Sequence, residues 1–202
     1  MQKYSTFWLL LIIFTFQGWV SKAQISQGGI PQSFAQDYLS AGFQHIDLSV
    51  PDVNQLTRED SLDGKNGRPL RVGVPIPVNI TINNAGTWAR LPGGGRIWRL
   101  ELKAKGALAM NINFSSFFLP EGTKLFIYDP PGTQVLGAFT SANNSKDSLF
   151  ATALINGDQL VLEYFEPSGT TLIPLLEISE ISYVYRDSQG NARTFARLSD
   201  HC

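Results

Sequence analysis

Residues 96–129 alternate apolar and polar side chains with a period of two, and this pattern limits the fold more than any other feature of the chain. Trp98 and Leu102 belong to one set of alternate positions, and charged residues occupy the other. A second alternating segment begins after Gly106, and a third apolar segment covers residues 125–128. Because successive side chains of an extended strand point to opposite faces, such alternation is typical of half-buried β-strands. The pattern predicts two or three successive strands that carry much of the core.

Short apolar segments also recur from residue 72 onward, with turn-forming residues between them. This spacing is typical of a sandwich or barrel. We predict an all-β fold, an antiparallel β-sandwich of jelly-roll type, over residues 74–186. Residues 24–73 are polar and charged without clear periodicity, which predicts an irregular N-terminal arm with a helical turn or two near residues 33–39 and no long helix. Residues 187–202 form a polar tail.

The segment before residue 24 has the three parts of a secretion signal. Lys3 supplies a basic start, residues 7–16 form an apolar stretch, and Ala23 completes a small-x-small cleavage signal. Because a membrane-spanning helix needs ~20 apolar residues, this stretch is too short for a permanent anchor. We predict processing after Ala23, a secreted or periplasmic location, and no membrane association after that cleavage.

Net charge and cysteine content restrict the partners and the compartment. The formal net charge is −1 at pH 7, and without a basic surface the chain is not expected to bind nucleic acid. Cys202 is the single cysteine and stands at the last position. A lone thiol in an oxidising compartment has either an intermolecular partner or a partner further along a longer chain. The core must therefore be stable without a disulfide.

Nucleophilic catalysis by this chain is not expected. A serine nucleophile of the triad type requires a histidine base, and the segment after the signal contains only His45 and His201. We interpret His45, in the predicted arm, as an ordinary surface or packing residue, and His201 lies in the tail. No Gly-x-Ser-x-Gly motif is present, and the terminal cysteine has no neighbouring catalytic partners.

Metal and cofactor binding are not expected either. Two histidines and one cysteine that lie far apart do not form a zinc-binding spacing. Asp129, Asp147 and Asp158 lie beside predicted turns and carry oxygen ligands that calcium accepts, but no calcium-loop motif accompanies them. We favour the interpretation that these aspartates accept hydrogen bonds from nearby backbone amides in turns.

Several aromatic residues lie close together in the sequence and admit two interpretations. Exposed aromatic rings could stack on a sugar, whereas in a sandwich such side chains usually fill the space between the sheets. We favour the core because Trp98 shares the face of two leucines, while Trp88, beside the turn at residues 83–86, is the better candidate for exposure. The residues concerned are Trp88, Trp98, Phe117, Phe118, Tyr128 and Phe139.

Short motifs follow one another in a fixed order through the predicted sandwich. They include Gly-Thr-Trp at 86–88, Trp-Arg-Leu at 98–100, Asn-Ile-Asn-Phe at 111–114, Phe-Phe-Leu-Pro-Glu-Gly at 117–122, Leu-Phe-Ile-Tyr at 125–128, Gly-Ala-Phe-Thr at 137–140 and Glu-Tyr-Phe-Glu-Pro at 163–167. In this order they resemble the N-terminal pro-region of secreted bacterial trypsin-like serine endopeptidases of the lysyl endopeptidase type. The similarity extends over roughly residues 69–185.

The resemblance implies a domain that accompanies a protease rather than one that cleaves peptide bonds. Its partner would be the cognate trypsin-like protease domain, which the pro-region would help to fold and would inhibit until cleavage. Arg197 would mark the processing site, and Cys202 would be available for a disulfide in the full-length precursor. We expect Trp88 and Phe34 to contact the partner. On this interpretation the chain is a truncated or frameshifted precursor or a part of one.

Two other functions stay open from the residues alone. A free-standing extracellular sandwich that binds a glycan or a surface protein predicts exposed aromatic residues around Trp88, residues 93–95 and residues 130–132. A structural envelope module instead predicts association through exposed sheet edges.

Overall fold

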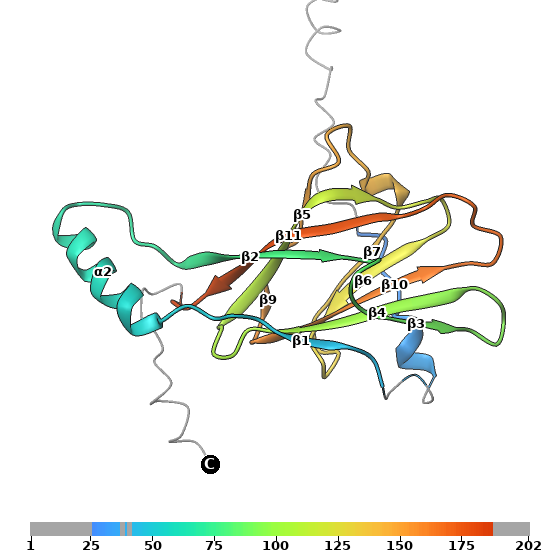
Figure 1. The fold of residues 1–202 in the computed structure, drawn as a ribbon, viewed down its shortest axis with the longest axis horizontal. Coiled ribbons are helices and arrows are strands. Elements are labelled where there is room, and N and C mark those ends of the chain that lie inside the picture. Colours follow the sequence, from blue (N-terminus) through green and yellow to red (C-terminus); the bar gives the residue numbers. More distant parts are fainter. Residues whose placement is uncertain (1–25, 37–38, 40–41, 188–202) are drawn as a thin grey trace, which may run out of the picture.

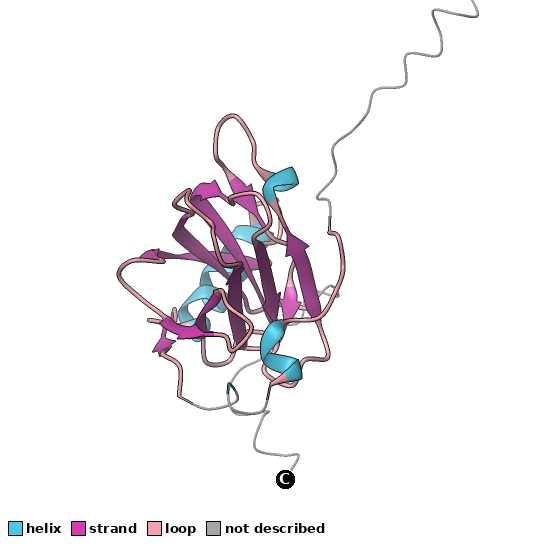
Figure 2. Ribbon diagram, turned by 90° about the vertical axis from the view of Figure 1, so that its right-hand side faces the viewer, coloured by secondary structure: helices cyan, strands magenta, loops and turns pink. Residues whose placement is uncertain are grey.

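A computed structural model describes residues 26–36, 39 and 42–187 of the chain. Its body consists of two β-sheets, sheet A and sheet B, which pack face to face (Figure 1). Figure 2 shows that strands make up most of the regular secondary structure of the body. This architecture confirms the predicted all-β sandwich. The boundaries between signal, arm, sandwich and tail remain predictions. No helix in the described part of the chain is long and apolar enough to span a membrane.

Sheet A contains six strands, namely β1 (His45–Asp47), β3 (Thr87–Arg90), β4 (Arg96–Lys103), β6 (Lys124–Tyr128), β7 (Val135–Phe139) and β10 (Gln159–Glu166). Their order across the sheet is β1-β4-β10-β6-β7, and β3 also pairs with β4. β1 runs parallel to β4, and the other pairs are antiparallel. Because β10 lies between β4 and β6, the sheet joins strands that are far apart in the sequence.

Sheet B contains five strands, namely β2 (Gly73–Thr81), β5 (Ala109–Phe118), β8 (Phe150–Ala151), β9 (Ile155–Asn156) and β11 (Leu175–Val184). Their order is β2-β11-β5-β8, with β9 also paired to β5. All of these pairs are antiparallel. The register of β11 shifts between Ile178 and Glu180, where the strand carries an irregularity against both of its neighbours.

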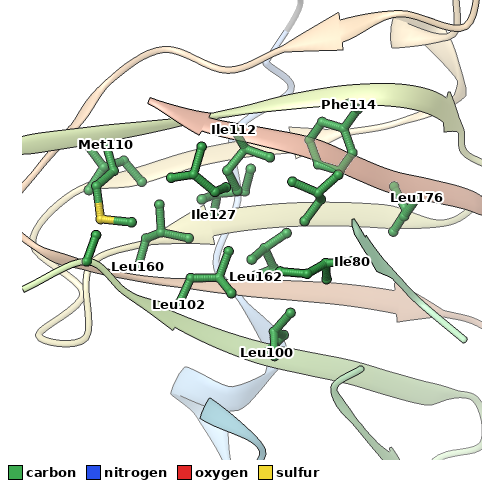
Figure 3. Close-up of a cluster of buried hydrophobic side chains, with 14 of the residues drawn as sticks. Ile80, Leu100, Leu102, Met110, Ile112, Phe114, Ile127, Leu160, Leu162 and Leu176 are labelled. Atoms are coloured by element: carbon green, nitrogen blue, oxygen red, sulfur yellow. The ribbon is translucent and has the colours of Figure 1, made fainter. Parts of the chain in front are cut away.

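Apolar side chains from both sheets fill the space between them (Figure 3). Leu100 and Leu102 of sheet A belong to the same buried cluster as Ile112 and Phe114 of sheet B. Trp98 is 1% exposed, which confirms its assignment to the core. Burying each large apolar side chain stabilises a fold by about 1.5–3 kcal/mol. The alternation that the sequence shows in residues 96–129 therefore corresponds to β4, β5 and β6 and to their inward positions.

The main departure from the sequence prediction is α2 (Val53–Lys65), a helix of 13 residues in the segment expected to be irregular. Asp52 caps its start, because the Asp52 side chain accepts hydrogen bonds from two backbone N–H groups of the first turn. Only Val53 and Asp60 of this helix are buried. The expectation of no long helix was wrong because so few apolar positions leave little periodicity to detect. A short 3-10 helix, η1 (Gln32–Ala35), does occur near the expected helical turn.

A buried cluster of charged and hydroxyl groups attaches α2 to the end of β11. Asp60 accepts hydrogen bonds from the Tyr185 hydroxyl at 2.6 Å, Arg186 Nη2 at 2.8 Å and Arg71 Nε at 2.9 Å. Burial opposes the ionisation of Asp60, but the hydrogen bonds from Tyr185, Arg186 and Arg71 outweigh it and hold the pKa of Asp60 below its ordinary value. We call these four residues the Asp60 network. It joins segments that are more than a hundred residues apart in the sequence.

Candidate partner interface

The start of the N-terminal arm lies against sheet A. Gln27 N donates a hydrogen bond to Ala138 O at 3.0 Å, and Ala138 N donates one to Gly28 O at 3.1 Å, so the arm pairs with the edge strand β7. A second, smaller apolar cluster lies on the outer face of the sheet, away from the main core. Its buried members are Phe126, Tyr128, Ala138 and Val161, and Phe43 packs against them. Part of this face is therefore already covered by the chain itself.

Phe34, predicted to contact a partner, packs on the protein's own surface. Its ring meets the ring of Tyr128 edge to face, with centroids 4.9 Å apart. A Cβ atom at Gly132 would come within 2.8 Å of the Phe34 ring, so the position of Phe34 depends on a glycine there. Phe34 remains 43% exposed. Its contact with a partner stays a prediction.

The carboxylate of Glu163 is fully buried and holds η1 against sheet A through hydrogen bonds. Ser33 N donates to Glu163 Oε1 at 3.2 Å, and the Tyr128 hydroxyl donates to Glu163 Oε2 at 3.1 Å. Burial, together with the negative charge of Glu163, raises the pKa of Tyr128, so the phenol keeps its proton. Since this proton points to Glu163, the Ser33 hydroxyl is the donor in its 3.1 Å hydrogen bond with Tyr128.

Trp88 lies at the exposed end of a row of aromatic side chains in sheet A. It stands opposite Trp98 across β3 and β4, and its ring meets Tyr164 edge to face with centroids 6.0 Å apart. The guanidinium carbon of Arg96 lies 4.1 Å from the centre of the Trp88 ring. Trp88 is 37% exposed, so it is more accessible than Trp98, as the sequence predicted. One face of its ring, however, is occupied by Arg96.

A pocket of about 610 Å³ opens beside Trp88. It lies between the β3–β4 hairpin and the loop that follows β10, and it is lined by residues 88–91, 94–96 and 166–170. Arg96 Nε donates a hydrogen bond to Glu166 Oε1 at 2.8 Å. The Tyr164 hydroxyl lies 3.3 Å from Glu166 Oε2. Burial raises the pKa of Tyr164, which keeps its hydroxyl protonated and able to donate to this carboxylate.

Sequence reasoning did not identify this pocket. One signal was available, because Arg96 has the same parity as Trp98 and therefore lies on the same face of β4, at the start of the strand. Its carboxylate partner, Glu166, is 70 residues away in the sequence. That separation gives no local pattern from which the ion pair could be inferred.

Three predicted site residues lie outside the described part of the chain, namely Ala23, Arg197 and Cys202. His201 lies there as well. His45 is in β1 and is exposed, in line with the interpretation of a surface histidine. The processing and disulfide roles of the first three residues stay predictions.

The three aspartates considered as calcium ligands serve nearby groups. Asp129 accepts hydrogen bonds from Gln134 N at 2.7 Å and from the Thr133 hydroxyl. Asp147 accepts one from Leu149 N at 3.3 Å, and Asp158 accepts one from Gly106 N at 3.1 Å. The contacts of Asp129 and Asp147 agree with the turn interpretation, whereas the amide that Asp158 accepts from is 52 residues away in the sequence. Within residues 26–36, 39 and 42–187, no group of three or more His, Cys, Asp or Glu side chains could hold a metal ion.

One comparison with known proteins identifies a family. The model of the lysyl endopeptidase N-terminal domain matches residues 46–185. The matched region begins within β1 and ends at Tyr185, so it contains α2 and both sheets. It also contains the pocket beside Trp88. The chain therefore belongs to the lysyl endopeptidase N-terminal domain family, the pro-region of such proteases.

Proposed function

We propose that this chain acts as the pro-region of a secreted trypsin-like endopeptidase, assisting the folding of the protease domain and inhibiting it until processing. The family match over residues 46–185 is the observation that carries this proposal. A rigid sandwich with a continuous core supports it, because a preformed surface can bind a partner without first losing conformational entropy. The signal sequence expected before residue 24 supports secretion.

The end of the sandwich opposite α2 is the best candidate for the contact with the protease. Figure 1 shows the β3–β4 hairpin and the β10–β11 loop side by side at this end. Leu172 and Ile173 of that loop are 60% and 74% exposed, and Trp88 is nearby in the pocket wall. Exposed apolar residues beside a polar pocket are a feature of protein-binding surfaces. An interface of about 1,600 Å² would be of standard size.

Addition of the full chain in trans to a catalytic domain of the lysyl endopeptidase type tests the proposal. We expect a higher refolding yield of the catalytic domain and slower cleavage of a small peptide substrate. No change in either quantity would refute the proposed function.

A pair of charge-introducing variants then locates the interface. The double replacement Leu172→Glu and Ile173→Glu should weaken inhibition by about tenfold or more, because a charge would be buried in the interface. Leu62→Glu on α2 is the matched control, since Leu62 is also 60% exposed. Equal inhibition by the double variant and the control would place the interface elsewhere.

The glycan-binding alternative receives less support from the geometry. A sugar ring usually needs a free aromatic face on which to stack, and Arg96 covers one face of Trp88. The part of Trp88 that stays exposed suits an apolar side chain better than a flat sugar ring.

A further inference from the structure

The pocket beside Trp88 contains an unbalanced positive charge. Arg90 and Arg96 stand directly opposite each other across β3 and β4, an arrangement that is unfavourable for two like charges. Glu166 is the single acidic residue among those lining the pocket, and it pairs with Arg96. The side chain of Arg90 is exposed and makes no hydrogen bond or ion pair with any residue that the structure describes. Of the two positive charges in the pocket, that of Arg90 therefore has no negative partner in the described part of the chain.

Arg96 is held in position with part of its hydrogen-bonding capacity unused. Its Nε atom bonds to Glu166, and its guanidinium plane lies over Trp88. The two terminal nitrogens make no hydrogen bond to a residue in the described part of the chain, and the side chain is 50% exposed. Since a guanidinium presents its donors in a fixed fork, a guanidinium already fixed by two contacts is prepared to bind an oxyanion.

Glu166, the acidic partner of Arg96, is also fixed in position, so it cannot pair with both Arg90 and Arg96. Its side chain is buried and also lies within hydrogen-bonding distance of the Tyr164 hydroxyl. Behind it, a Cβ atom at Gly95 would come within 2.6 Å of Glu166 O, and Gly95 has φ of +83°. The hairpin and the β10–β11 loop therefore touch through their backbones, and this contact fixes the pocket wall.

We propose that the pocket binds the carboxylate of an aspartate or glutamate side chain presented by a peptide segment of the protein partner. The carboxylate oxygens would accept hydrogen bonds from Arg90 and from the terminal nitrogens of Arg96. A neighbouring apolar residue of the segment would pack against the free edge of Trp88. The identity of the partner as the protease rests on the proposed function, whereas the chemistry of the pocket does not.

Titration calorimetry with two blocked pentapeptides tests this inference directly. One peptide carries Leu-Glu-Leu at its centre and the other Leu-Gln-Leu, and both are added to the full chain. We expect one bound Glu peptide per chain and at least about tenfold weaker binding of the Gln peptide, because the charge-assisted hydrogen bonds are lost. Equal binding of the two peptides, or no binding of either, would overturn the proposal.

Variants of the protein separate the pocket from other basic sites. Arg90→Gln removes the unpaired charge and leaves the Arg96–Glu166 pair intact, and it should weaken binding of the Glu peptide by about tenfold. Arg96→Lys keeps a positive charge beside Glu166 but removes the planar fork, and it should also weaken binding. Arg68→Gln is the control, because Arg68 is exposed and pairs with Asp63 at the end of α2.

Each outcome of these titrations either supports or refutes the binding of a carboxylate in the pocket. Loss of affinity in both pocket variants, with the Arg68→Gln control unchanged, supports the proposal. Unchanged affinity in Arg90→Gln refutes it. Tighter binding of an oligogalacturonate than of the Glu peptide would also refute it, since the ligand would then be an acidic sugar. Failure of the peptide titration would not affect the trans inhibition assay, so failures of the two proposals can be told apart.

Discussion

Replacing Asp60 by alanine should release α2 from the end of the sandwich while the two sheets stay folded. Asp60 accepts hydrogen bonds from Tyr185, Arg186 and Arg71 and is 6% exposed. Val53 is the one fully buried apolar residue of α2, and Leu56 packs against the core in a partly buried position. The apolar packing of the helix is therefore limited to these two side chains, and the Asp60 network supplies much of the remaining attachment.

The loss in unfolding free energy in Asp60→Ala depends on whether the two arginines left without Asp60 stay buried or return to water. Removing one partner of a buried ion pair costs about 3–5 kcal/mol when the other charge stays buried. Arg186 would stay buried only if α2 remained in place. Undocking of the helix returns Arg186 and Arg71 to water and gives up the burial of Val53 and part of that of Leu56, about 2–4 kcal/mol. It also gives up the partly exposed Arg71–Glu59 pair, which contributes at most about 1 kcal/mol. We therefore expect the loss in unfolding free energy to level off at about 2–4 kcal/mol.

Hydrogen exchange distinguishes local release from global unfolding. A free helix of 13 residues is marginal in water, so the amides of α2 should lose their protection in Asp60→Ala. Amides of the central strand β10 should keep theirs. Asp63→Ala in the same helix is the control, because the Asp63–Arg68 pair is exposed to solvent and such pairs contribute at most about 1 kcal/mol. Retained protection of α2, or simultaneous exposure of β10, would refute this reasoning.

Acidification should have the same effect as the substitution. The pKa of Asp60 in the folded protein lies below its ordinary value, so ionised Asp60 favours the folded state. This contribution is fully present above the unfolded carboxyl pKa of about 3.9. It is lost as the pH falls from there through the lower folded pKa. Protection of α2 should therefore decline below about pH 4, and Asp60→Asn should lack this component of the pH dependence.

Two further substitutions test the packing of sheet A. Gly86→Ala should cost at least about 2 kcal/mol in urea unfolding, because Gly86 has φ of +86° and an added Cβ would overlap the Trp98 indole. Gly157→Ala is the control, because Gly157 has φ of +110° and no atom lies within 4 Å of the added Cβ. It should cost about 1 kcal/mol from backbone strain alone. Equal losses in the two variants would contradict the steric argument. Tyr128→Phe removes a hydroxyl donor from buried Glu163 and should cost about 1–3 kcal/mol of unfolding free energy. Limited proteolysis should then cut residues 26–36 faster than in the unaltered protein. An unchanged cleavage rate would show that this hydroxyl does not hold the arm.

The strands were predictable where burial enforces a simple period. Trp98 and Leu102 lie on the face of β4 that both sheets enclose, so the alternation in the sequence reports directly on the environment of each side chain. The order of the strands was not predictable in this way. β10 lies between β4 and β6 although the first of these precedes it by more than fifty residues, and no local pattern specifies that pairing.

α2 and the pocket escaped prediction for a related reason. Each depends on charged residues from distant segments. Asp60 appears in the sequence as one more acidic residue of a charged stretch, and Arg96 as one of several arginines. Their partners in the ion pairs, Arg186 and Glu166, are far away in the sequence and are brought close by the pairing of the strands. The spacing of apolar residues gives no information about a charged side chain that can be buried only because it pairs with an opposite charge elsewhere in the chain.

α2, which carries Asp60, lies at the opposite end of the sandwich from the β3–β4 hairpin and the β10–β11 loop, which line the pocket (Figure 1). This separation restricts how the proposed complex can form. β11 has 10 residues, so its ends are separated by about 33 Å. A protease domain joined to the chain after residue 187 and bound at the pocket would need a connection of about ten extended residues. Residues 188–202 are numerous enough for this connection. Binding at the pocket in cis is therefore compatible with the attachment of α2 at the other end, and neither contact has to open to allow the other.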